Sequence, residues 1–462
     1  MSKTLSLVML ALAPLMPAQT PEHHKVVMSL PQSASAVPNQ TLQPQTSSVN
    51  LPHEAPIPRP HGIGYTGGPI MVETKPYLIW YGDWSNNTAP AIVNDFAAHI
   101  GGSLYGNIAR SYYDSGNNRN SNVVLPSVNY YDSGSRGFSS LVDYDFYLIV
   151  MNAIRSGKVG KADPNGIYFV MTAPGVGVNG YGTSFCGWHN WLNKYDFPEL
   201  GNLTLKVSFV GPGGGGCTVQ SGKSPNNNPG ADASLTIWAH EYHETVSDPE
   251  LSAWIDFTGG PAEDGDKCTW NMGPEQTAPN GSKYNLQLGD RQYLVQQIWA
   301  NDGPGYCTMQ WPAPISATGK FYIISKNGGK CLTATGTASQ RGMPVNQDTC
   351  YDGPEQTWMF KLVNGGYEIT NQGNGQQLDV RGGPGATANG VPIQTWPFWG
   401  GSNELFGFSD PNHSGGYSDF TAFNSARVLD VWGASKLDNI PIQQYDFLNG
   451  PNQNWRLVSA QQ

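Results

Sequence analysis

The feature that most constrains the fold is a sequence pattern that occurs three times, about every 45–50 residues, in the last third of the chain. Each copy has a strand centred on Leu, then a strand that contains Ile or Val before Gln or Asn, then a corner that ends in an aromatic residue. The corner residues are Trp358, Phe406 and Trp455. One copy alone cannot bury an apolar core, so the three must share one. The pattern predicts an all-β domain over residues 319–462.

The residues inside the copies carry a resemblance to a known family. The second copy reads Leu378-Asp379-Val380-Arg381, Ile393-Gln394-Thr395-Trp396 and Asn403-Glu404-Leu405-Phe406. The third reads Leu429-Asp430-Val431-Trp432, Ile442-Gln443-Gln444-Tyr445 and Asn452-Gln453-Asn454-Trp455. This pattern resembles the ricin-type lectins, which implies a β-trefoil that binds carbohydrate.

In that family an Asp accepts hydrogen bonds from two sugar hydroxyls, an aromatic ring stacks on the sugar, and Asn and Gln side chains brace the Asp. Ring stacking supplies desolvated contact and the hydrogen bonds supply orientation. By position, the resemblance implies these carbohydrate-binding residues: Asp379, Arg381, Gln394, Trp396 and Asn403 in the second copy, and Asp430, Trp432, Gln443, Tyr445, Asn452 and Gln453 in the third.

The first copy departs from the pattern. Thr333 stands where Asp is expected and Asp348 where the aromatic is expected, so we expect this copy not to bind sugar. Glu404 replaces the usual Gln in the second copy. The family also implies a disulfide between Cys331 and Cys350. The alternative is a trefoil that serves only as a scaffold or spacer.

Upstream, residues 67–312 predict an α/β module, because apolar strand patterns alternate with helical ones. Strands are expected at 76–81, 122–131, 167–171 and 206–210, and helices at 91–113 and 139–156. A further helix is expected at 233–246, with Asp232 or Ser234 as its N-cap and a stop at Ser247-Asp248-Pro249.

That last helix carries the main chemical signal of the module. His240 and Glu244 are four residues apart and therefore share one face of the helix. A zincin helix uses this spacing for two metal ligands, and Glu241 is placed as the general base that activates a metal-bound water. The sequence departs from His-Glu-x-x-His, because the second His falls one position early at 243. We predict one divalent metal, with zinc favoured, in a zincin-like module.

The third metal ligand has several candidates. Glu263 is the first choice, and Asp266, Asp248 and the more distant His189 are the others. The alternative to a metal site is a solvated acidic helix end followed by an Asp-Pro turn.

Further short segments carry a second resemblance. They are Gly67-Gly68-Pro69-Ile70, the strand from Tyr77 to Trp80, Cys186-Gly187-Trp188-His189, His240-Glu241 with Glu244 and Asp248-Pro249, Trp254 with Asp256, and Asp266-Lys267-Cys268. Residues 67–307 are similar to the EXORDIUM (phosphate-induced protein) family, including its microbial members. Plant members are extracellular proteins tied to growth signalling, and microbial members with this His-Glu element look like variant metallohydrolases.

The start of the chain predicts export. Lys3 precedes an apolar run from Leu5 to Leu15, which is typical of a signal peptide over residues 1–19. Residues 20–66 are rich in Pro, Ser, Gln and Asn and predict a disordered spacer or propeptide. Six cysteines are then expected to pair in an oxidising compartment. Fifteen connectivities exist for six cysteines, and pairing of sequence neighbours is the simplest.

These features together predict a secreted, glycan-targeted, metal-dependent hydrolase that cleaves a peptide or glycoprotein bond. The alternatives are a non-catalytic extracellular lectin or signalling protein, and a glycoside hydrolase that uses paired carboxylates. Carbohydrate is the expected partner. A net charge of −10 without a basic run argues against nucleic acid or an anionic membrane surface as a partner. The sequence makes no prediction of oligomeric state.

Overall fold

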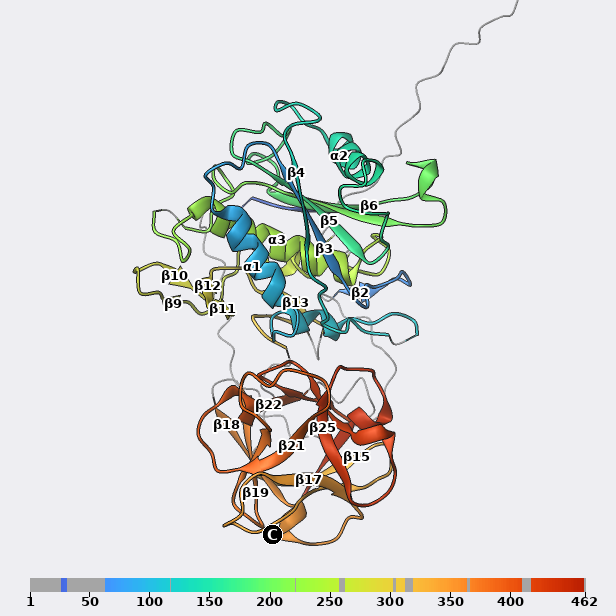
Figure 1. The fold of residues 1–462 in the computed structure, drawn as a ribbon, viewed down its shortest axis with the longest axis vertical. Helices are drawn as coiled ribbons and strands as arrows, with labels where there is room; N and C mark the ends of the chain where they lie inside the picture. The colour runs from blue at the N-terminus through green and yellow to red at the C-terminus, as the bar shows by residue number, and fades with distance from the viewer. Residues whose placement is uncertain are drawn as a thin grey trace, which may run out of the picture.

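A computed structural model of the chain describes residues 26–30, 63–116, 118–220, 222–256, 262–301, 305–311, 319–363, 366–408 and 417–460. The predicted signal peptide, most of the predicted spacer and the linker at 312–318 lie outside these residues. The chain folds into a mixed α/β module, the N-terminal module, and an all-β C-terminal domain, which are drawn one above the other in Figure 1.

The N-terminal module is built on a six-stranded mixed sheet in the order β1-β6-β7-β5-β3-β4. The strands are β1 (Val26–Met28), β3 (Lys75–Tyr81), β4 (Val128–Asp132), β5 (Gly166–Thr172), β6 (Gly187–Leu192) and β7 (Leu205–Val210). β3, β4, β5 and β7 run parallel, while β6 is antiparallel to β7 and β1 is antiparallel to β6. Every residue of β5 and β7 is buried, as expected for central strands covered on both faces.

Helices cover both faces of this sheet. α1 (Ala89–Ile100) and α3 (Pro229–Ser247) lie on one side, and α2 (Asp143–Arg155) lies on the other (Figure 1). The helix predicted at 91–113 is interrupted after Ile100 by Gly101 and Gly102, and the chain resumes as the 3-10 helix η1 (Gly106–Ser111). Gly102 has a φ of 71°, a left-handed conformation that ends a helix at little cost for glycine.

Two sequence-based expectations were wrong in this module. The N-cap of α3 is Asn228 rather than Asp232 or Ser234, since the Asn228 side chain accepts a hydrogen bond from the Ala231 N–H at 3.1 Å and Pro229 follows it. The strand predicted at 122–131 begins only at Val128.

Part of the predicted spacer is also structured. Residues 26–28 form β1 and pair with β6, and Met28 is buried in the module core. Three residues are too few to show a period, so this pairing was invisible in the sequence. Smaller two-stranded sheets complete the module. They are β2 (Gly64–Tyr65) with β8 (Trp254–Ile255), β9 (Gln276–Thr277) with β10 (Lys283–Tyr284), β11 (Leu286–Leu288) with β12 (Arg291–Tyr293), and β13 (Ile298–Ala300) with β14 (Tyr306–Thr308).

Within its described residues, the C-terminal domain has twelve strands, four in each of the three sequence repeats. The first repeat has β15 (Gly319–Ser325), β16 (Cys331–Ala334), β17 (Met343–Asp348) and β18 (Trp358–Val363). The second has β19 (Gly366–Asn371), β20 (Gln377–Val380), β21 (Val391–Trp396) and β22 (Leu405–Phe408). The third has β23 (Phe420–Ala422), β24 (Val428–Val431), β25 (Ile440–Tyr445) and β26 (Trp455–Ser459).

The predicted shared core is confirmed. Trp358, Phe406 and Trp455 are fully buried in one cluster to which all three repeats contribute. The indole N–H of Trp358 donates to the Leu332 carbonyl at 2.9 Å, and that of Trp455 donates to the Leu429 carbonyl at 3.1 Å. The two tryptophans therefore occupy equivalent places and satisfy their only donor inside the core.

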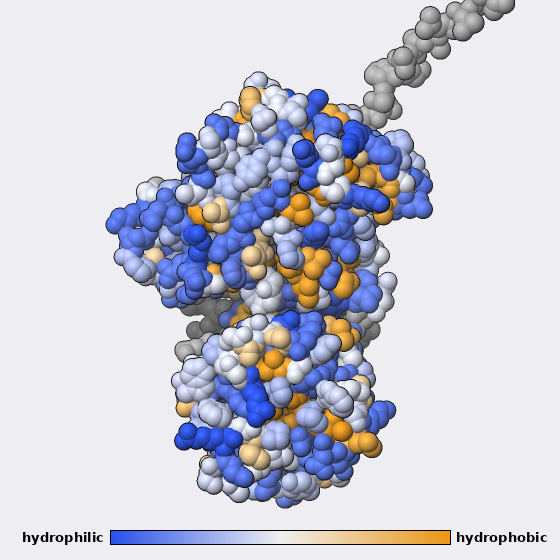
Figure 2. Space-filling view, in the orientation of Figure 1, coloured by the Kyte–Doolittle hydropathy of each residue, from blue (hydrophilic) through white to orange (hydrophobic). Residues whose placement is uncertain are grey.

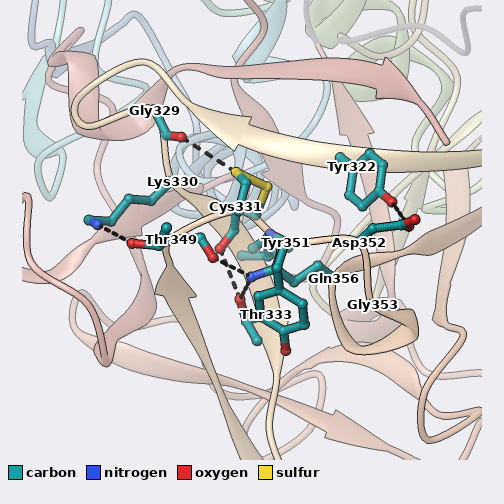
Figure 3. Close-up of a disulfide and its surroundings, with 12 residues drawn as sticks. Tyr322, Gly329, Lys330, Cys331, Thr333, Thr349, Tyr351, Asp352, Gly353 and Gln356 are labelled. Carbon is teal, nitrogen blue, oxygen red and sulfur yellow. Dashed lines mark hydrogen bonds between the residues drawn. A yellow bond between two sulfur atoms is a disulfide. The ribbon is translucent and has the colours of Figure 1, made fainter.

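All six cysteines pair with their sequence neighbours, which confirms the simplest connectivity. The disulfides are Cys186–Cys217, Cys268–Cys307 and Cys331–Cys350. The last lies inside the first repeat, as Figure 3 shows.

None of the described helices combines the length and the hydropathy that a bilayer crossing requires. On the face drawn in Figure 2, hydrophilic residues predominate and hydrophobic ones lie in separate small groups.

A buried ion pair joins the two parts of the chain. Arg110, at the end of η1, donates to the carboxylate of Asp419 at 3.0 Å, and the two side chains are 1% and 7% exposed. The Arg110 guanidinium also lies 4.2 Å from the ring centroid of Phe447 in the third repeat. A desolvated guanidinium held by both a carboxylate and an aromatic ring fixes the orientation of the two parts.

Replacing Arg110 by Met should lower the free energy of unfolding by about 3–5 kcal/mol, because the buried carboxylate of Asp419 loses the guanidinium that compensates its charge. Thermal and urea unfolding measure the effect. The Arg110→Met/Asp419→Asn double variant should recover part of the loss. Arg136→Met is the matched control, since its pair with Asp145 is partly exposed and worth at most about 1 kcal/mol. Equal losses in Arg110→Met and Arg136→Met would contradict the buried-pair assignment.

Candidate functional site

Helix α3 is buried along nearly its whole length, between the sheet and α1. His240, Glu241 and Glu244 have no exposed surface. Most helices that carry His and Glu expose them, because a buried charge without a partner is costly. These side chains must therefore be neutralised by other groups inside the module.

The predicted pair on one helix face is brought into contact. Nε2 of His240 lies 2.9 Å from Oε1 of Glu244. Asp266 joins them, since its Oδ1 lies 3.6 Å from the same His240 nitrogen and its backbone N–H donates to Glu244 Oε1 at 3.0 Å. We call His240, Glu244 and Asp266 the first ligand group, whose ligand atoms lie within 4.8 Å of one another.

His189 on β6 approaches the other side of Glu244. Its Nδ1 lies 3.4 Å from Glu244 Oε2 and 3.5 Å from Glu241 Oε2. His189, Glu241 and Glu244 form the second ligand group, again within 4.8 Å. The sequence had placed Glu241 as a general base and His189 as a distant alternative, whereas the structure places both among the potential ligands.

Two glycines allow these close approaches. A Cβ on Gly187 would stand 2.7 Å from Oε1 of Glu241, and a Cβ on Gly265 would stand 2.8 Å from Nδ1 of His240. Any side chain at either position would push into the cluster. Glycine is therefore required on both sides of α3.

Glu263, the predicted third ligand, lies outside both groups. Its Oε2 is 3.6 Å from Nε2 of His189, the ring nitrogen that faces away from Glu241 and Glu244. Asp248 is the C-cap residue of α3, and its Oδ1 holds the turn that follows by accepting from the backbone N–H groups of Ser252 and Ala253, both at 2.6 Å. The solvated-helix-end alternative does not hold, since this end of α3 is buried.

The cluster contains more polar atoms than the described residues satisfy. The following buried atoms have no hydrogen-bond partner among those residues: both ring nitrogens of His189 and His243, Nε2 of His240, both oxygens of Glu241, Glu263 and Asp264, Oε2 of Glu244 and Oδ2 of Asp248. Native proteins leave few such atoms, and a local concentration of them calls for a bound ion or water.

The pKa shifts of the buried histidines and carboxylates also favour a bound cation. Burial alone would lower the pKa of His189, but its contacts with Glu241 and Glu244 outweigh burial and raise it to about 10. The same balance, with Glu244 as the main partner, raises the pKa of His240 to about 10. Burial and neighbouring carboxylates raise the pKa of Glu263 well above its usual range. The carboxylates thus hold a strong local field that favours a cation, whether a proton or a metal ion.

Gln296, which the sequence gave no reason to choose, orients His240. Its Oε1 lies 3.3 Å from Nδ1 of His240, and its amide group donates to the Gly265 carbonyl at 2.8 Å. The backbone N–H of Gln296 donates to Thr236 on α3 at 2.7 Å. A carbonyl oxygen facing Nδ1 favours a proton on that nitrogen and leaves Nε2 free to bind a metal.

In the C-terminal domain, the predicted sugar-site residues of the second repeat come together. Asp379 pairs with Gln394 across β20 and β21. Oδ1 of Asp379 accepts from Gln394 at 2.7 Å, and Oδ2 accepts from Asn403 at 2.6 Å. Arg381 donates to Gln394 at 3.1 Å, and Trp396, on the same strand as Gln394, is partly exposed.

The third repeat has the same frame. Oδ1 of Asp430 accepts from Gln443 at 2.9 Å, and Oδ2 accepts from Asn452 at 2.7 Å and from Gln453 at 3.0 Å. Trp432 is 59% exposed and Tyr445 is partly exposed. In both repeats the Asp is braced on each oxygen by an amide and keeps further lone pairs free to accept.

The first repeat lacks this frame, as predicted. Thr333 takes the place of the Asp, and its hydroxyl accepts from Gln356 at 3.0 Å (Figure 3). Asp348, at the aromatic position, accepts from the backbone N–H of Asn439 at 2.8 Å and so ties the first repeat to the third. These side chains are used for internal contacts.

Glu404 in the second repeat lacks the hydrogen-bond donor that Gln provides at the same position of the other two repeats. At this position Gln356 and Gln453 each use their amide oxygen to accept a loop N–H and their NH₂ group to donate toward the site. Glu404 accepts three loop N–H groups, those of Trp399, Gly400 and Gly401, but has nothing to donate to Asp379. Burial raises the pKa of Asp379 to about 7. The charge of Glu404 adds to this increase, and the hydrogen bond from Gln394 opposes it.

Comparison with solved structures gives matches that each cover part of the chain. A designed three-fold symmetric protein, ThreeFoil, is 30% identical, with 30% of this chain and 99% of that chain covered and a TM-score of 0.29. The Macrolepiota procera ricin B-like lectin in complex with lactose is 15% identical, with 32% and 99% covered and a TM-score of 0.27. A family model described as "Ricin-type beta-trefoil lectin domain-like" matches residues 308–396.

Two curated relatives match about half of the chain. Protein EXORDIUM-like 5 of Arabidopsis thaliana is 25% identical over 276 residues, which cover 51% of this chain and 75% of the relative. Protein EXORDIUM-like 3 of the same plant is 25% identical over 288 residues, which cover 53% and 82%. The model of the "Phosphate-induced protein 1 conserved region" matches residues 63–309, more than half of the chain. The chain therefore belongs to the phosphate-induced protein 1, or EXORDIUM, family, and a lectin-like domain follows its family region.

Proposed function

We propose that this protein is an extracellular glycan-binding member of the EXORDIUM family, whose C-terminal domain is a β-trefoil with two sugar sites. The observation that carries the proposal is the Asp braced by two or more amides in the second and third repeats, beside a partly exposed aromatic residue. A carboxylate held in this way presents its remaining lone pairs to sugar hydroxyls, and the ring covers the apolar face of the sugar.

Two further features support the proposal. The first repeat shows what a copy without a site looks like, because Thr333 and Asp348 there make internal hydrogen bonds. Three disulfides, which use every cysteine of the chain, favour an oxidising extracellular setting. Two weak sites on one rigid domain would bind a polymeric glycan through avidity.

A second candidate function is metal-dependent hydrolysis in the N-terminal module, with one zinc ion held by His240 and Glu244 and with Glu241 as general base. The buried cluster of histidines and unpartnered carboxylates favours a metal centre. Zinc accepts such mixed nitrogen and oxygen ligands. Glu241 is completely buried, so hydrolysis requires a movement of the chain that lets the substrate reach this base.

Asp379→Asn and Asp430→Asn should each remove one sugar site, because an amide cannot accept two hydroxyls while its own NH₂ group faces the bracing amides. Each single variant should weaken binding to a polymeric glycan by at least about tenfold, which corresponds to about 1.4 kcal/mol, and the double variant should abolish it. A glycan array identifies the ligand and calorimetry with lactose gives the affinity. Asp348→Asn in the first repeat is the control and should bind as the wild type does. Binding that survives in the double variant would refute the site assignment.

Binding at the second repeat should weaken as the pH falls through about 7, because the pKa of Asp379 is raised to about 7. Below that pH the carboxyl carries a proton on an oxygen that must accept hydrogen bonds, whereas above it the carboxylate is ionised. Glu404→Gln should restore binding at about pH 6, since it removes the neighbouring charge and supplies a donor of the kind Gln453 offers to Asp430. Calorimetry in an Asp430→Asn background, at about pH 8 and about pH 6, isolates this site. If sugar binding had the same pH dependence in the Asp430→Asn protein with and without Glu404→Gln, the role given to Glu404 would be wrong.

Glu241→Gln separates two roles for this residue. A general base is needed for the reaction but not for binding the metal, so loss of hydrolysis with retained metal would support catalysis. A ligand is needed for binding, so a fall in metal content would support coordination. Elemental analysis of the purified full-length protein and a protease-substrate screen measure both. Full metal content together with full activity would exclude both roles.

A further inference from the structure

We propose that the buried cluster binds two divalent cations that share Glu244 as a bridging carboxylate. The first ion would lie in the first ligand group (His240, Glu244, Asp266) and the second in the second ligand group (His189, Glu241, Glu244). This inference rests on the metal centre proposed above and adds a second ion and three ligands to it: His189, Glu241 and Asp266.

The two oxygens of Glu244 face different histidines. Oε1 lies 2.9 Å from Nε2 of His240, and Oε2 lies 3.4 Å from Nδ1 of His189. A carboxylate that points one oxygen at each of two imidazoles has the geometry of a bridge. Bridged pairs in two-metal sites are typically about 3.5–4 Å apart, a spacing that one carboxylate spans.

Three of the four contacts between a histidine nitrogen and a carboxylate oxygen within the groups match the edges of a coordination shell, and the fourth, from Nε2 of His240 to Oε1 of Glu244 at 2.9 Å, has the length of a hydrogen bond. With metal–ligand bonds of about 2.0–2.1 Å, neighbouring ligands of a tetrahedral ion lie about 3.3 Å from each other. Nδ1 of His189 is 3.4 and 3.5 Å from its two carboxylate oxygens, and Nε2 of His240 is 3.6 Å from Asp266. These distances are too long for strong hydrogen bonds and are close to the edge that an ion between them would impose.

Each histidine faces an oxygen atom with its other ring nitrogen. Nδ1 of His240 faces Oε1 of Gln296 at 3.3 Å, and Nε2 of His189 faces Oε2 of Glu263 at 3.6 Å. Metal-binding histidines usually offer their second ring nitrogen to a carbonyl or carboxylate, which sets the tautomer and the ring orientation. Glu263 thus lies in the cluster outside both ligand groups, facing the nitrogen of His189 that the second ligand group does not use.

A network of ion pairs without metal explains the cluster less well. Such a network would satisfy its members by hydrogen bonds, yet both nitrogens of His189 and both oxygens of Glu241 have no hydrogen-bond partner among the described residues. His189 faces Oε2 of Glu244 and His240 faces Oε1. A single ion would therefore fill only one of the two ligand groups. Two divalent cations would place positive charge beside the carboxylates of both groups and use every ligand atom of both.

The test is the number of ions bound by the full-length protein. The protein is stripped with a chelator, reloaded with Zn²⁺ and weighed by native mass spectrometry. Wild type should bind two ions. His189→Gln and His240→Gln should each bind one, and Glu244→Gln should lose at least one. His243→Gln is the matched control, since His243 is equally buried on α3 but lies against the rings of Tyr105 and Tyr242 and outside both groups, and it should still bind two.

A measurement on the wild type alone guards against variants that fail to fold. After reloading with Mn²⁺, two ions bridged by a carboxylate should give an exchange-coupled electron paramagnetic resonance spectrum, whereas one isolated ion gives the simple six-line signal. One ion per chain, or an uncoupled spectrum at full loading, would overturn the bridged pair and leave a single metal centre standing. No bound ion would overturn both, and neither result bears on glycan binding by the C-terminal domain.

Discussion

The N-terminal module depends on the burial of the charged side chains of α3. The helix passes beneath the sheet with His240, Glu241 and Glu244 in its interior-facing surface, where water cannot solvate them. β6 supplies His189 from above, and the segment with Glu263 and Asp266 closes the cluster from the other side. Glycines 187 and 265 are needed because the backbone comes within contact distance of these side chains. The compensation of this buried charge thus determines how three distant segments pack.

The C-terminal domain depends on a different constraint, the shared apolar core of its repeats. Because Trp358, Phe406 and Trp455 fill equivalent places, the strand pairs that carry the polar frame are also equivalent. Residues outside the core can then differ from one repeat to another. The first repeat uses this freedom for a disulfide and internal hydrogen bonds, the second carries Glu404, and the third keeps the full set of bracing amides.

Arg110 connects the N-terminal module to the C-terminal domain. Its guanidinium reaches out of the N-terminal module to Asp419 and the ring of Phe447, and Phe447 follows Tyr445 of the third repeat by two residues. A buried ion pair contributes orientation more than net stability, because desolvation offsets much of its attraction. The second and third repeats, which carry the proposed sugar sites, are therefore held in a defined direction relative to the module that carries the proposed metal centre.

Features that depend on local spacing could be predicted from the residues alone. The three-fold pattern predicted the shared core, the i, i+4 spacing predicted that His240 meets Glu244, apolar runs predicted β3, β5 and β7, and neighbour pairing predicted the disulfides. Only the tertiary structure decided which groups meet the helix from elsewhere. It placed His189 and Asp266 in the ligand groups, moved Glu263 to the far side of His189, added Gln296, and paired β1 with β6. These contacts depend on where separate strands and loops come to lie in the folded chain, and no period or spacing along the sequence records that.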